Sequence, residues 1–282
     1  MLDLSPFFIL DPQRPHRWVS RAQCPNFRGG LFGGQLLAHG LSAIANTYPD
    51  KPVHMLHTQF LAAGDTQSPI EYKVLCLRRG RSFSHFQIHA RQKRRLIATM
   101  IAACHQGETG FTHQEPAPPL KPPELSHAQV LPVFEIDNWL LGHGEETPLE
   151  FVHAQGARLD QSIEEDGASS CWLRIRAPLT QAQQLPALAF ISDLGILASA
   201  LIPHPTHLFH HNLAPASLNH TLWLHSPQVD LNQWHLLTVT SPWAGHGRGL
   251  GQGYLYTAQG ELIATATQEG LIRPVAPPAK PV

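Results

Sequence analysis

A proline-rich segment near the middle of the chain limits how this sequence can fold, because it separates two halves. Residues 115–124 contain five prolines, and proline lacks the backbone N–H that the interior of a helix or sheet needs. We therefore predict an extended linker over residues 113–126. This linker separates an N-terminal repeat, residues 1–112, from a C-terminal repeat, residues 127–273, and a flexible proline-rich tail follows at 274–282.

The N-terminal half shows one helical pattern followed by several strand patterns. Apolar residues recur at helical spacing over 31–45, with a Gly-Gly turn at its start. Alternating or continuous apolar runs that are typical of strands come next. These predicted strands are 56–61, 70–77, 82–89 and 96–104, with a hairpin turn at 91–95.

The C-terminal half repeats this order. Helical spacing covers 190–200, and the predicted strands are 218–225, 234–240, 249–256 and 262–268. Short strings also match: His57-Thr58 lines up with His220-Thr221, and Leu96-Ile-Ala-Thr99 lines up with Leu262-Ile-Ala-Thr265. One helix followed by antiparallel strands, given twice, indicates an internal duplication and an α+β fold.

Composition bounds the class of protein. The chain is 43% hydrophobic and 15% charged, which is enough apolar surface for a sizeable core. Its formal net charge of -1 provides no global field for nucleic acid or an anionic membrane, so we expect neither as a partner. The four cysteines form no Cys-x-x-Cys pair, and we find no export signal and no peroxisomal Ser-Lys-Leu end. We therefore expect a cytoplasmic protein with reduced thiols.

Motifs for metals and nucleotide cofactors are weak or missing. The histidine run over 204–211 has spacings that suit a metal site on a helix, but Pro205 interrupts any helix there, so we predict no metal. The glycines of 247–253 lack the strand-turn-helix context of a phosphate loop. We interpret them as a turn leading into a strand that packs closely on another backbone. No cofactor is predicted.

Three polar residues are candidates for chemistry, although two of them are ordinary on their own. Asp193 is predicted to open the second helix, either as a capping residue or as a base beside a helix N-terminus. The matching position in the first half is Gln35, which cannot act as a base. Ser217 precedes a predicted strand and Gln268 ends one, and neither position alone indicates a site.

Several strings, taken in order, carry a family resemblance. They are Phe32-Gly-Gly-Gln35, Val53–Phe60, Gly64-Asp65, Arg81–Ser84, Gly110–Gln114, Ser192-Asp-Leu194, Asn219–His225 and Gln268-Glu-Gly270. In these strings the chain resembles the type II acyl-CoA thioesterases (TesB-like) from about residue 29 to residue 274, with little to align over 120–185.

The resemblance implies a double hotdog, in which each half wraps a curved antiparallel sheet around one long helix. It also implies hydrolysis of fatty acyl-CoA to free acid and CoA, without a metal or covalent cofactor. The family's catalytic Asp, Thr or Ser, and Gln fall on Asp193, Ser217 and Gln268 here. Where the family commonly has Thr this chain has Ser217, so the hydroxyl is kept while the rotamer is less restricted.

The same resemblance implies residues for substrate binding and an assembly state. His57 is assigned a supporting role near the pocket, beside Gln35. Gly33 and Gly34 would permit close backbone approach at the first helix start. Arg81, with Arg78 and Arg79, is a candidate for the CoA phosphates, although a solvated basic turn explains these residues better. By analogy we expect a homo-oligomer, a dimer or a tetramer.

Two alternatives remain open at this point. A non-catalytic acyl-CoA-binding protein on the same fold is one, since fold does not determine function. A hotdog dehydratase or hydratase acting on acyl-CoA is the other. Such an enzyme needs a histidine paired with a carboxylate at a helix start, and Asp193 has no obvious histidine partner in the sequence.

Overall fold

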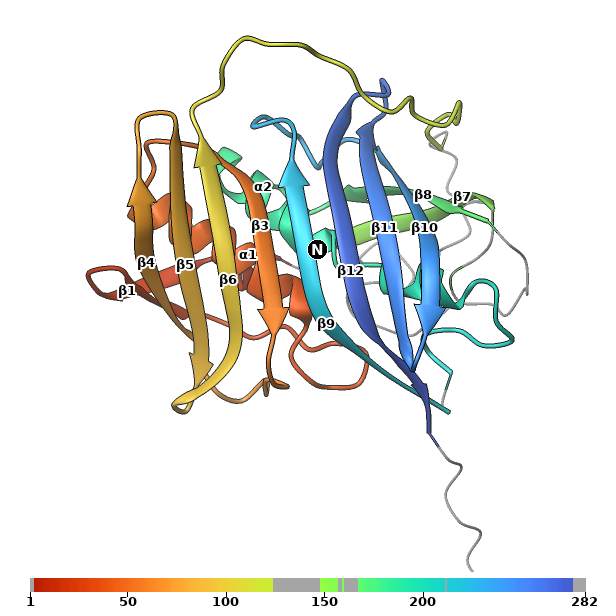
Figure 1. Cartoon of the computed structure of the whole chain (residues 1–282), viewed down its shortest axis with the longest axis horizontal. Coiled ribbons are helices and arrows are strands. Elements are labelled where there is room, and N and C mark those ends of the chain that lie inside the picture. The colour runs from red at the N-terminus through yellow and green to blue at the C-terminus, as the bar shows by residue number, and fades with distance from the viewer. Residues whose placement is uncertain (1–2, 124–147, 157–158, 160–166, 211, 276–282) are drawn as a thin grey trace, which may run out of the picture.

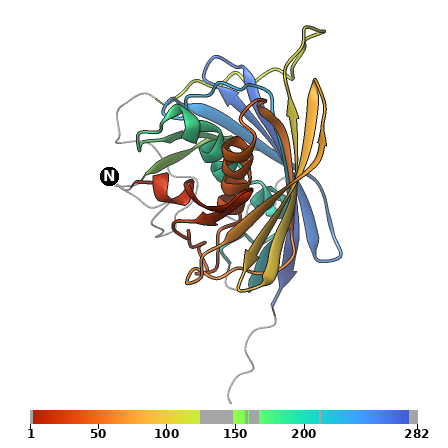
Figure 2. The same cartoon turned by 90° about the vertical axis from the view of Figure 1, so that its left-hand side faces the viewer.

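One curved antiparallel sheet wraps around the helices of both halves. The computed structural model describes residues 3–123, 148–156, 159, 167–210 and 212–275. Its strands form a 12-stranded sheet, seen face-on in Figure 1. In the side view of Figure 2, the helices lie on the concave side of this sheet. Within the described residues, no helix is both long and apolar enough to cross a membrane.

Each half contributes the same series of elements. The N-terminal half holds β1 (Leu10–Arg14), β2 (Arg17–Ser20), α1 (Gly33–Thr47), β3 (Val53–Phe60), β4 (Glu71–Arg79), β5 (Phe83–Gln92) and β6 (Arg95–His105). The C-terminal half holds β7 (Leu149–Gly156), β8 (Ser169–Ile175), α2 (Gln181–Ile191), β9 (Leu213–Leu224), β10 (His235–Gly245), β11 (Arg248–Thr257) and β12 (Leu262–Pro274). Short 3-10 helices lie at Ser5–Phe7 (η1) and Leu197–Leu201 (η3). Residues 276–282 of the predicted tail lie outside the described residues.

The order of strands across the sheet mirrors the duplication. From edge to edge it is β1-β2-β4-β5-β6-β3-β9-β12-β11-β10-β8-β7. The second half therefore repeats the first half in reverse, and the two halves join where β3 pairs with β9. At this junction His57 pairs with Thr221 and Thr58 pairs with His220. The predicted α+β fold of two helix-and-sheet repeats is confirmed.

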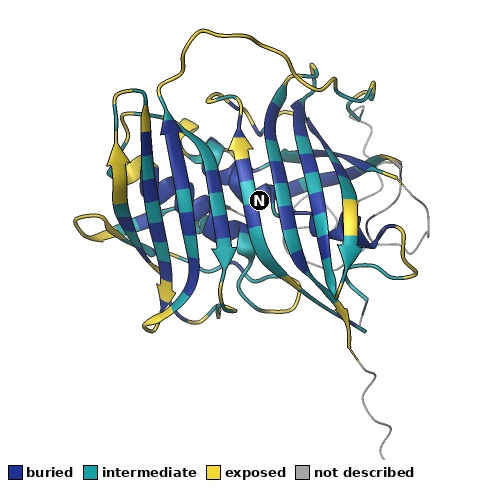
Figure 3. Cartoon of the chain, viewed as in Figure 1, coloured by how far each residue is buried: buried dark blue, intermediate teal, exposed yellow. Residues whose placement is uncertain are grey.

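Burial alternates along the strands and defines two faces of the sheet. Figure 3 shows this alternation as bands along each strand. Leu56 of β3 and Met100 of β6 are fully buried and lie beside Gly40 of α1. The face that carries them is the inner face, and residues one position away point to the outer face because side chains alternate along a strand. This geometry decides which polar residues can reach a site under the helices.

The second helix differs from its prediction. A helix over 190–200 is wrong, because α2 covers Gln181–Ile191 and ends there. Its start is marked by a capping box, in which the Gln183 side chain accepts the backbone N–H of Thr180. The chain then turns at Gly195, whose φ of 84° is left-handed and ends helical geometry. The apolar spacing after residue 190 therefore belongs to a buried turn and to η3.

The glycines over 247–253 pack as interpreted from the sequence. A Cβ on Gly251 of β11 would lie 2.1 Å from the carbonyl oxygen of Ile196. A Cβ on Gly249 would lie 2.4 Å from the Cβ of Ala200. The missing side chains thus let η3 and the turn before it rest directly on β11.

The described part of the predicted linker lies along the outer face of the C-terminal half. The Gln114 side chain donates to the carbonyl of Gly260 at 2.7 Å and accepts the N–H of Leu262 at 3.0 Å. Linker residues also cover a small apolar cluster on that face. The cluster is Val152, Trp172, Leu236 and Tyr256, and the linker residues on it are Ala117 and Leu120. Residues 124–126 of the predicted linker lie outside the described residues.

Candidate active site

A cavity of about 450 Å³ lies between the start of α1, the end of β3, the first half of β9 and the turn after α2. Its walls are mainly apolar and include Phe32, Leu36, Phe60, Leu194, Phe209 and Leu218. Three polar side chains that the sequence singled out also line it: Asp193, Ser217 and Gln268. An apolar cavity with a few converging polar groups suits a ligand that has a long apolar part and one polar reacting group.

Asp193 reaches this cavity from the turn that follows α2. The prediction that Asp193 opens a helix is wrong, because α2 ends at Ile191. The Asp193 carboxylate instead accepts the backbone N–H of Gly34, in the first turn of α1. The N-cap residue of α1, Phe32, provides no side-chain hydrogen bond. A carboxylate from the C-terminal half therefore pairs with a backbone N–H that has no partner within the helix at the start of α1, in the N-terminal half.

Gln268 joins the three polar side chains. It is 1% exposed and lies within β12, not at the end of a strand as predicted. Its Nε2 donates to Asp193 Oδ1 at 2.5 Å and to Ser217 Oγ at 2.8 Å. The structure thus brings together three residues that are far apart in the sequence.

A β-bulge directs Ser217 into the cavity. Ser217 lies within β9 and not before the strand as predicted. Across β9 and β12, Asn219 pairs with Glu269 and Ser217 pairs with Gly270, so Leu218 is an extra residue. Without this bulge, Ser217 and Asn219 would point to the same face. With it, Asn219 bonds Glu269 while Ser217 bonds Gln268 on the inner face.

The environment of Asp193 changes its acidity. The side chain is 5% exposed, and burial raises the pKa of the Asp193 carboxyl to about 7, opposed by the hydrogen bonds from Gln268 and Gly34. A carboxyl with this pKa takes up and releases a proton near neutral pH, which suits a general base.

The histidine-rich run 204–211 borders the cavity through Leu208 and Phe209. Among the residues that the structure describes, no cluster of three or more His, Cys, Asp or Glu side chains is placed to hold a metal ion. His211 lies outside the described residues. The run contributes apolar lining to the cavity.

Comparison with known proteins places this chain in a family. Residues 21–105 match the acyl-CoA thioesterase N-terminal domain, and residues 122–272 match the acyl-CoA thioesterase C-terminal domain. Acyl-CoA thioesterase 2 of Haemophilus influenzae is 35% identical over 257 residues, which are 86% of this chain and 87% of that protein. The chain belongs to the acyl-CoA thioesterase family. The resemblance found in the sequence is confirmed.

Solved structures agree with the fold of the family. Acyl-CoA thioesterase II TesB2 from Mycobacterium marinum has a TM-score of 0.78 and 28% identity, and 99% of each chain is covered. A protein with a hot dog fold from Alicyclobacillus acidocaldarius has a TM-score of 0.73 at 19% identity, covering 97% of this chain and 98% of that one. The double hotdog expected from the resemblance is confirmed.

In this member of the acyl-CoA thioesterase family, Gly33 and Gly34 form the first turn of α1 instead of a turn before it. Gly33 lines the cavity, and a Cβ on it would lie 2.7 Å from Asp193 Oδ2. A Cβ on Gly34 would lie 2.3 Å from the carbonyl oxygen of Phe190 in α2. Both glycines thus allow the start of α1 to approach the end of α2.

His57, for which the sequence predicts a supporting role near the pocket, is not among the residues that line the cavity. Its neighbours Leu56 and Thr58 are fully buried on the inner face, so alternation places His57 on the outer face. There its Nδ1 bonds the Thr221 hydroxyl at 2.7 Å, across the junction of β3 and β9. His57 therefore links the two halves of the sheet.

Gln35 and Arg81 also lie away from the cavity lining. Gln35 is fully buried, accepts the N–H of Cys24 at 2.7 Å and donates to the carbonyl of Ala22 at 2.8 Å. It ties the loop before α1 to the helix. Arg81 is exposed in the turn between β4 and β5, beside the start of β3, whereas the cavity lies at the end of β3, about 25 Å away along the strand.

Sequence reasoning missed a histidine beside Asp193. His220 Nδ1 lies 3.9 Å from Asp193 Oδ1, which corrects the statement that Asp193 has no histidine partner. His220 is fully buried on the inner face. One signal for it was present in the sequence: its alignment with His57 across the duplication, which pairs β3 with β9.

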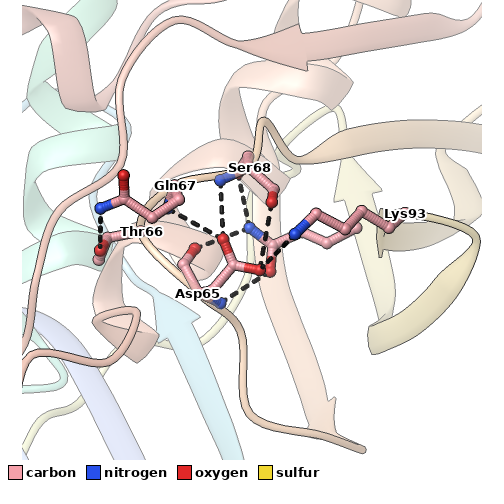
Figure 4. A network of polar contacts seen from close by, with 6 residues as sticks. Asp65, Thr66, Gln67, Ser68 and Lys93 are labelled. Carbon is pink, nitrogen blue, oxygen red and sulfur yellow. Dashed lines mark hydrogen bonds and ion pairs between the residues drawn. The ribbon is translucent and has the colours of Figure 1, made fainter.

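A hydrogen-bond network holds the loop that forms one wall of the cavity. This loop, residues 61–64, leads directly into Asp65. Asp65 accepts the backbone N–H groups of Gln67 and Ser68, as Figure 4 shows. The buried Gln92 of β5 accepts the N–H of Asp65 at 2.9 Å and donates to the carbonyls of Asp65 and Ser68.

Gln92→Ala is expected to lower the free energy of unfolding by about 1–3 kcal/mol, because it leaves buried backbone groups of the loop unpaired. Lys93→Ala is the matched control. The ion pair of Lys93 with Asp65 spans 3.6 Å between side chains that are 74% and 47% exposed, so its loss should change stability by less than about 1 kcal/mol. Urea denaturation measures both variants. Equal losses for the two would contradict the role of Gln92.

Proposed function

We propose that this chain hydrolyses fatty acyl-CoA to free acid and CoA, with Asp193, Ser217 and Gln268 acting on one water molecule. The observation that carries this proposal is the hydrogen-bonded set of these three side chains on the wall of an apolar cavity. The apolar lining suits an acyl chain. The activity in the names of its relatives supports the same substrate class.

The hydrogen bonds support a different role for each side chain. Gln268 occupies Asp193 Oδ1, so Oδ2 is the oxygen that takes a proton. Ser217 Oγ accepts from Gln268, which leaves its own O–H to donate to a water oxygen. A water placed between them donates to Asp193 Oδ2 and points a lone pair at the thioester carbonyl carbon.

In the hydrolysis that follows, each bond that forms is matched by a bond that breaks. The water oxygen forms a bond to the carbonyl carbon while its proton moves to Asp193, and the carbonyl electrons move onto oxygen. The oxyanion lies beside the start of α1, where Gly33 lines the cavity and its backbone N–H, in the first turn of the helix, is the donor in this proposal. The C–S bond breaks as the carbonyl re-forms, and the thiolate of CoA receives the proton from Asp193. A carboxyl with a pKa of about 7 suits both proton transfers.

The position of His220 weighs against a dehydratase. Such an enzyme needs a histidine that contacts the substrate, and His220 is fully buried without lining the cavity. Asp193, Ser217 and Gln268 offer one base, one hydroxyl and one amide at the cavity wall instead. This set favours hydrolysis over dehydration and over binding alone.

The test is thiol release from acyl-CoA substrates of short, medium and long chain, with wild type, Ser217→Ala and Ser217→Thr. We expect release by wild type and a loss of about 10–100-fold in kcat for Ser217→Ala, because the water loses one of its positioning groups. Ser217→Thr keeps the hydroxyl and should keep most of the turnover. Binding without release of thiol by wild type would instead show a non-catalytic acyl-CoA-binding protein.

We further propose that the protein works in the cytoplasm as a homo-oligomer, a dimer or a tetramer. All four cysteines lie among the described residues and none of them forms a disulfide there, which suits a reducing compartment. Trp223 of β9 is 37% exposed on the outer face, where it pairs with Met55 of β3 at the centre of the sheet. An exposed aromatic residue at this position supports contact with a second copy.

A further inference from the structure

His220 lies at the centre of the buried polar residues beside the site. On β9 it pairs with Gln268 of β12 on one side and with Thr58 of β3 on the other. All three side chains are buried, and alternation places them on the inner face. The Nδ1 atom of His220 lies 3.9 Å from Asp193 Oδ1. His220 is therefore close enough to change the proton affinity of the Asp193 carboxylate without contacting a ligand in the cavity.

The hydrogen bonds of Ser192 determine which ring nitrogen of His220 carries the hydrogen. Ser192 Oγ donates its only hydrogen to the carbonyl of Ala189 at 2.8 Å. Ser192 Oγ also lies 3.1 Å from His220 Nε2, so in that contact it can only accept. Nε2 must then carry the hydrogen, and Nδ1 carries a lone pair. Burial lowers the pKa of His220 to about 3, which keeps the ring neutral.

The lone pair on Nδ1 belongs to an atom that lies 3.9 Å from a carboxylate oxygen of Asp193. Within the described part of the chain, Nδ1 of His220 has no hydrogen-bond partner. A lone pair 3.9 Å from Asp193 Oδ1 disfavours the negative carboxylate relative to the neutral carboxylic acid, because two electron-rich groups repel each other. The opposite tautomer would place the positive hydrogen of an N–H near the carboxylate and have the opposite effect.

We propose that Ser192 and His220 form a tautomer lock, in which Ser192 holds the lone pair of His220 toward Asp193 and this lone pair sets the proton affinity of the carboxylate during hydrolysis. His220 is a positioning residue in this proposal, since it acts only through Asp193. The inference rests on the proposed role of Asp193 as the base.

Other charged groups do not account for this effect. Gly33 and Gly34 of α1 and Gln268 of β12 carry no charge. His57 lies on the outer face of β3. On β11 and β12, Arg248 pairs with Glu269, which follows the inward-facing Gln268 and so points to the outer face. Among these described residues, His220 is the titratable side chain that lies beside Asp193 on the inner face.

The deciding variant is Ser192→Ala, compared with Ser192→Thr. Without a hydroxyl to accept from Nε2, the hydrogen of His220 moves to Nδ1, where its positive charge stabilises the carboxylate of Asp193. In a plot of kcat against pH, the acid limb should then shift to lower pH by about one unit. Ser192→Thr keeps the acceptor and should keep the wild-type profile. His220→Gln can still donate to Ser192 but has no lone pair at the Nδ1 position, and should shift the limb in the same direction.

Nitrogen NMR of ¹⁵N-histidine-labelled protein reads the tautomer directly, with the His220 signal assigned by its absence in His220→Gln. We expect a protonated Nε2 in wild type and a protonated Nδ1 in Ser192→Ala. A wild-type signal with hydrogen on Nδ1, or an unmoved acid limb in both Ser192→Ala and His220→Gln, overturns the lock. If Asp193→Asn abolishes turnover while these profiles stay unmoved, only the lock fails. If Asp193→Asn keeps turnover, the base assignment fails and the lock fails with it.

Discussion

Asp193→Asn is expected to lower kcat for acyl-CoA hydrolysis by about 10²–10⁴-fold, because the water loses its base. The amide keeps an oxygen that can accept from Gln268 and Gly34, so the geometry of the site should persist. Thiol release from a medium-chain acyl-CoA measures the change. Turnover close to that of wild type would mean that another group takes the proton and that Asp193 serves only to cap α1.

The same substitution should stabilise the protein at about pH 8. The pKa of Asp193 is about 7 in the folded state against an ordinary value of 3.8, so the folded state binds this proton more tightly than the unfolded state. The stability from that proton is fully present below about pH 4 and is lost as pH rises through about 7. The loss is on the order of 2–4 kcal/mol.

Asp193→Asn has no such titration, so its denaturation midpoint should exceed that of wild type at about pH 8 and approach it at about pH 4. Ser217→Ala is the control, since it removes a partner of Gln268 without removing a charge. A difference between wild type and Asp193→Asn that does not change with pH would show that burial does not raise the pKa of this carboxyl.

Gly34→Ala is expected to destabilise the protein by about 3 kcal/mol or more. The added Cβ would lie 2.3 Å from the carbonyl oxygen of Phe190 and 2.5 Å from the ring of Phe32. A backbone carbonyl cannot move aside as the end of a side chain can, so α1 and α2 must separate. Because the N–H of Gly34 bonds Asp193, the separation should lower kcat as well.

Gly40→Ala is the matched control in the same helix. Its Cβ would meet the Sδ of Met100 at 2.7 Å and the Cδ2 of Leu56 at 3.2 Å, and both atoms belong to the outer parts of side chains that can rotate. Alanine also favours helix over glycine by about 1 kcal/mol, which offsets the repacking. Thermal and urea denaturation compare the two variants. If Gly40→Ala lost as much stability as Gly34→Ala, close contact between the helices would not be the cause.

The strands were the most predictable part of the fold. Each of the eight predicted strands overlaps a strand of the sheet, because alternation of apolar and polar residues is a local pattern set by the two faces of a sheet. The second helix was less predictable. α2 is buried on most sides and so lacks a polar stripe, and the apolar spacing continues past Ile191 into a buried turn where helical geometry has ended.

The candidate site, like the fold, was predictable from the sequence only in part. The residue types of Asp193, Ser217 and Gln268 and their match to a family could be found from the sequence, because family strings are local. Their arrangement could not, since Asp193 meets the start of a helix from the other half of the chain. Ser217 turns inward only through a bulge at Leu218 that depends on its pairing with β12.

The sequence by itself determined the duplication, the α+β class, the strand patterns and the identity of the polar candidates, because each of these is written in residues close together in the chain. Only the tertiary structure decided which candidates share the cavity, that His57 points away from it, and that His220 lies beside Asp193. Those outcomes depend on strand register and on the packing of α1 against α2. Both are set by contacts between residues far apart in sequence, and no local pattern encodes them.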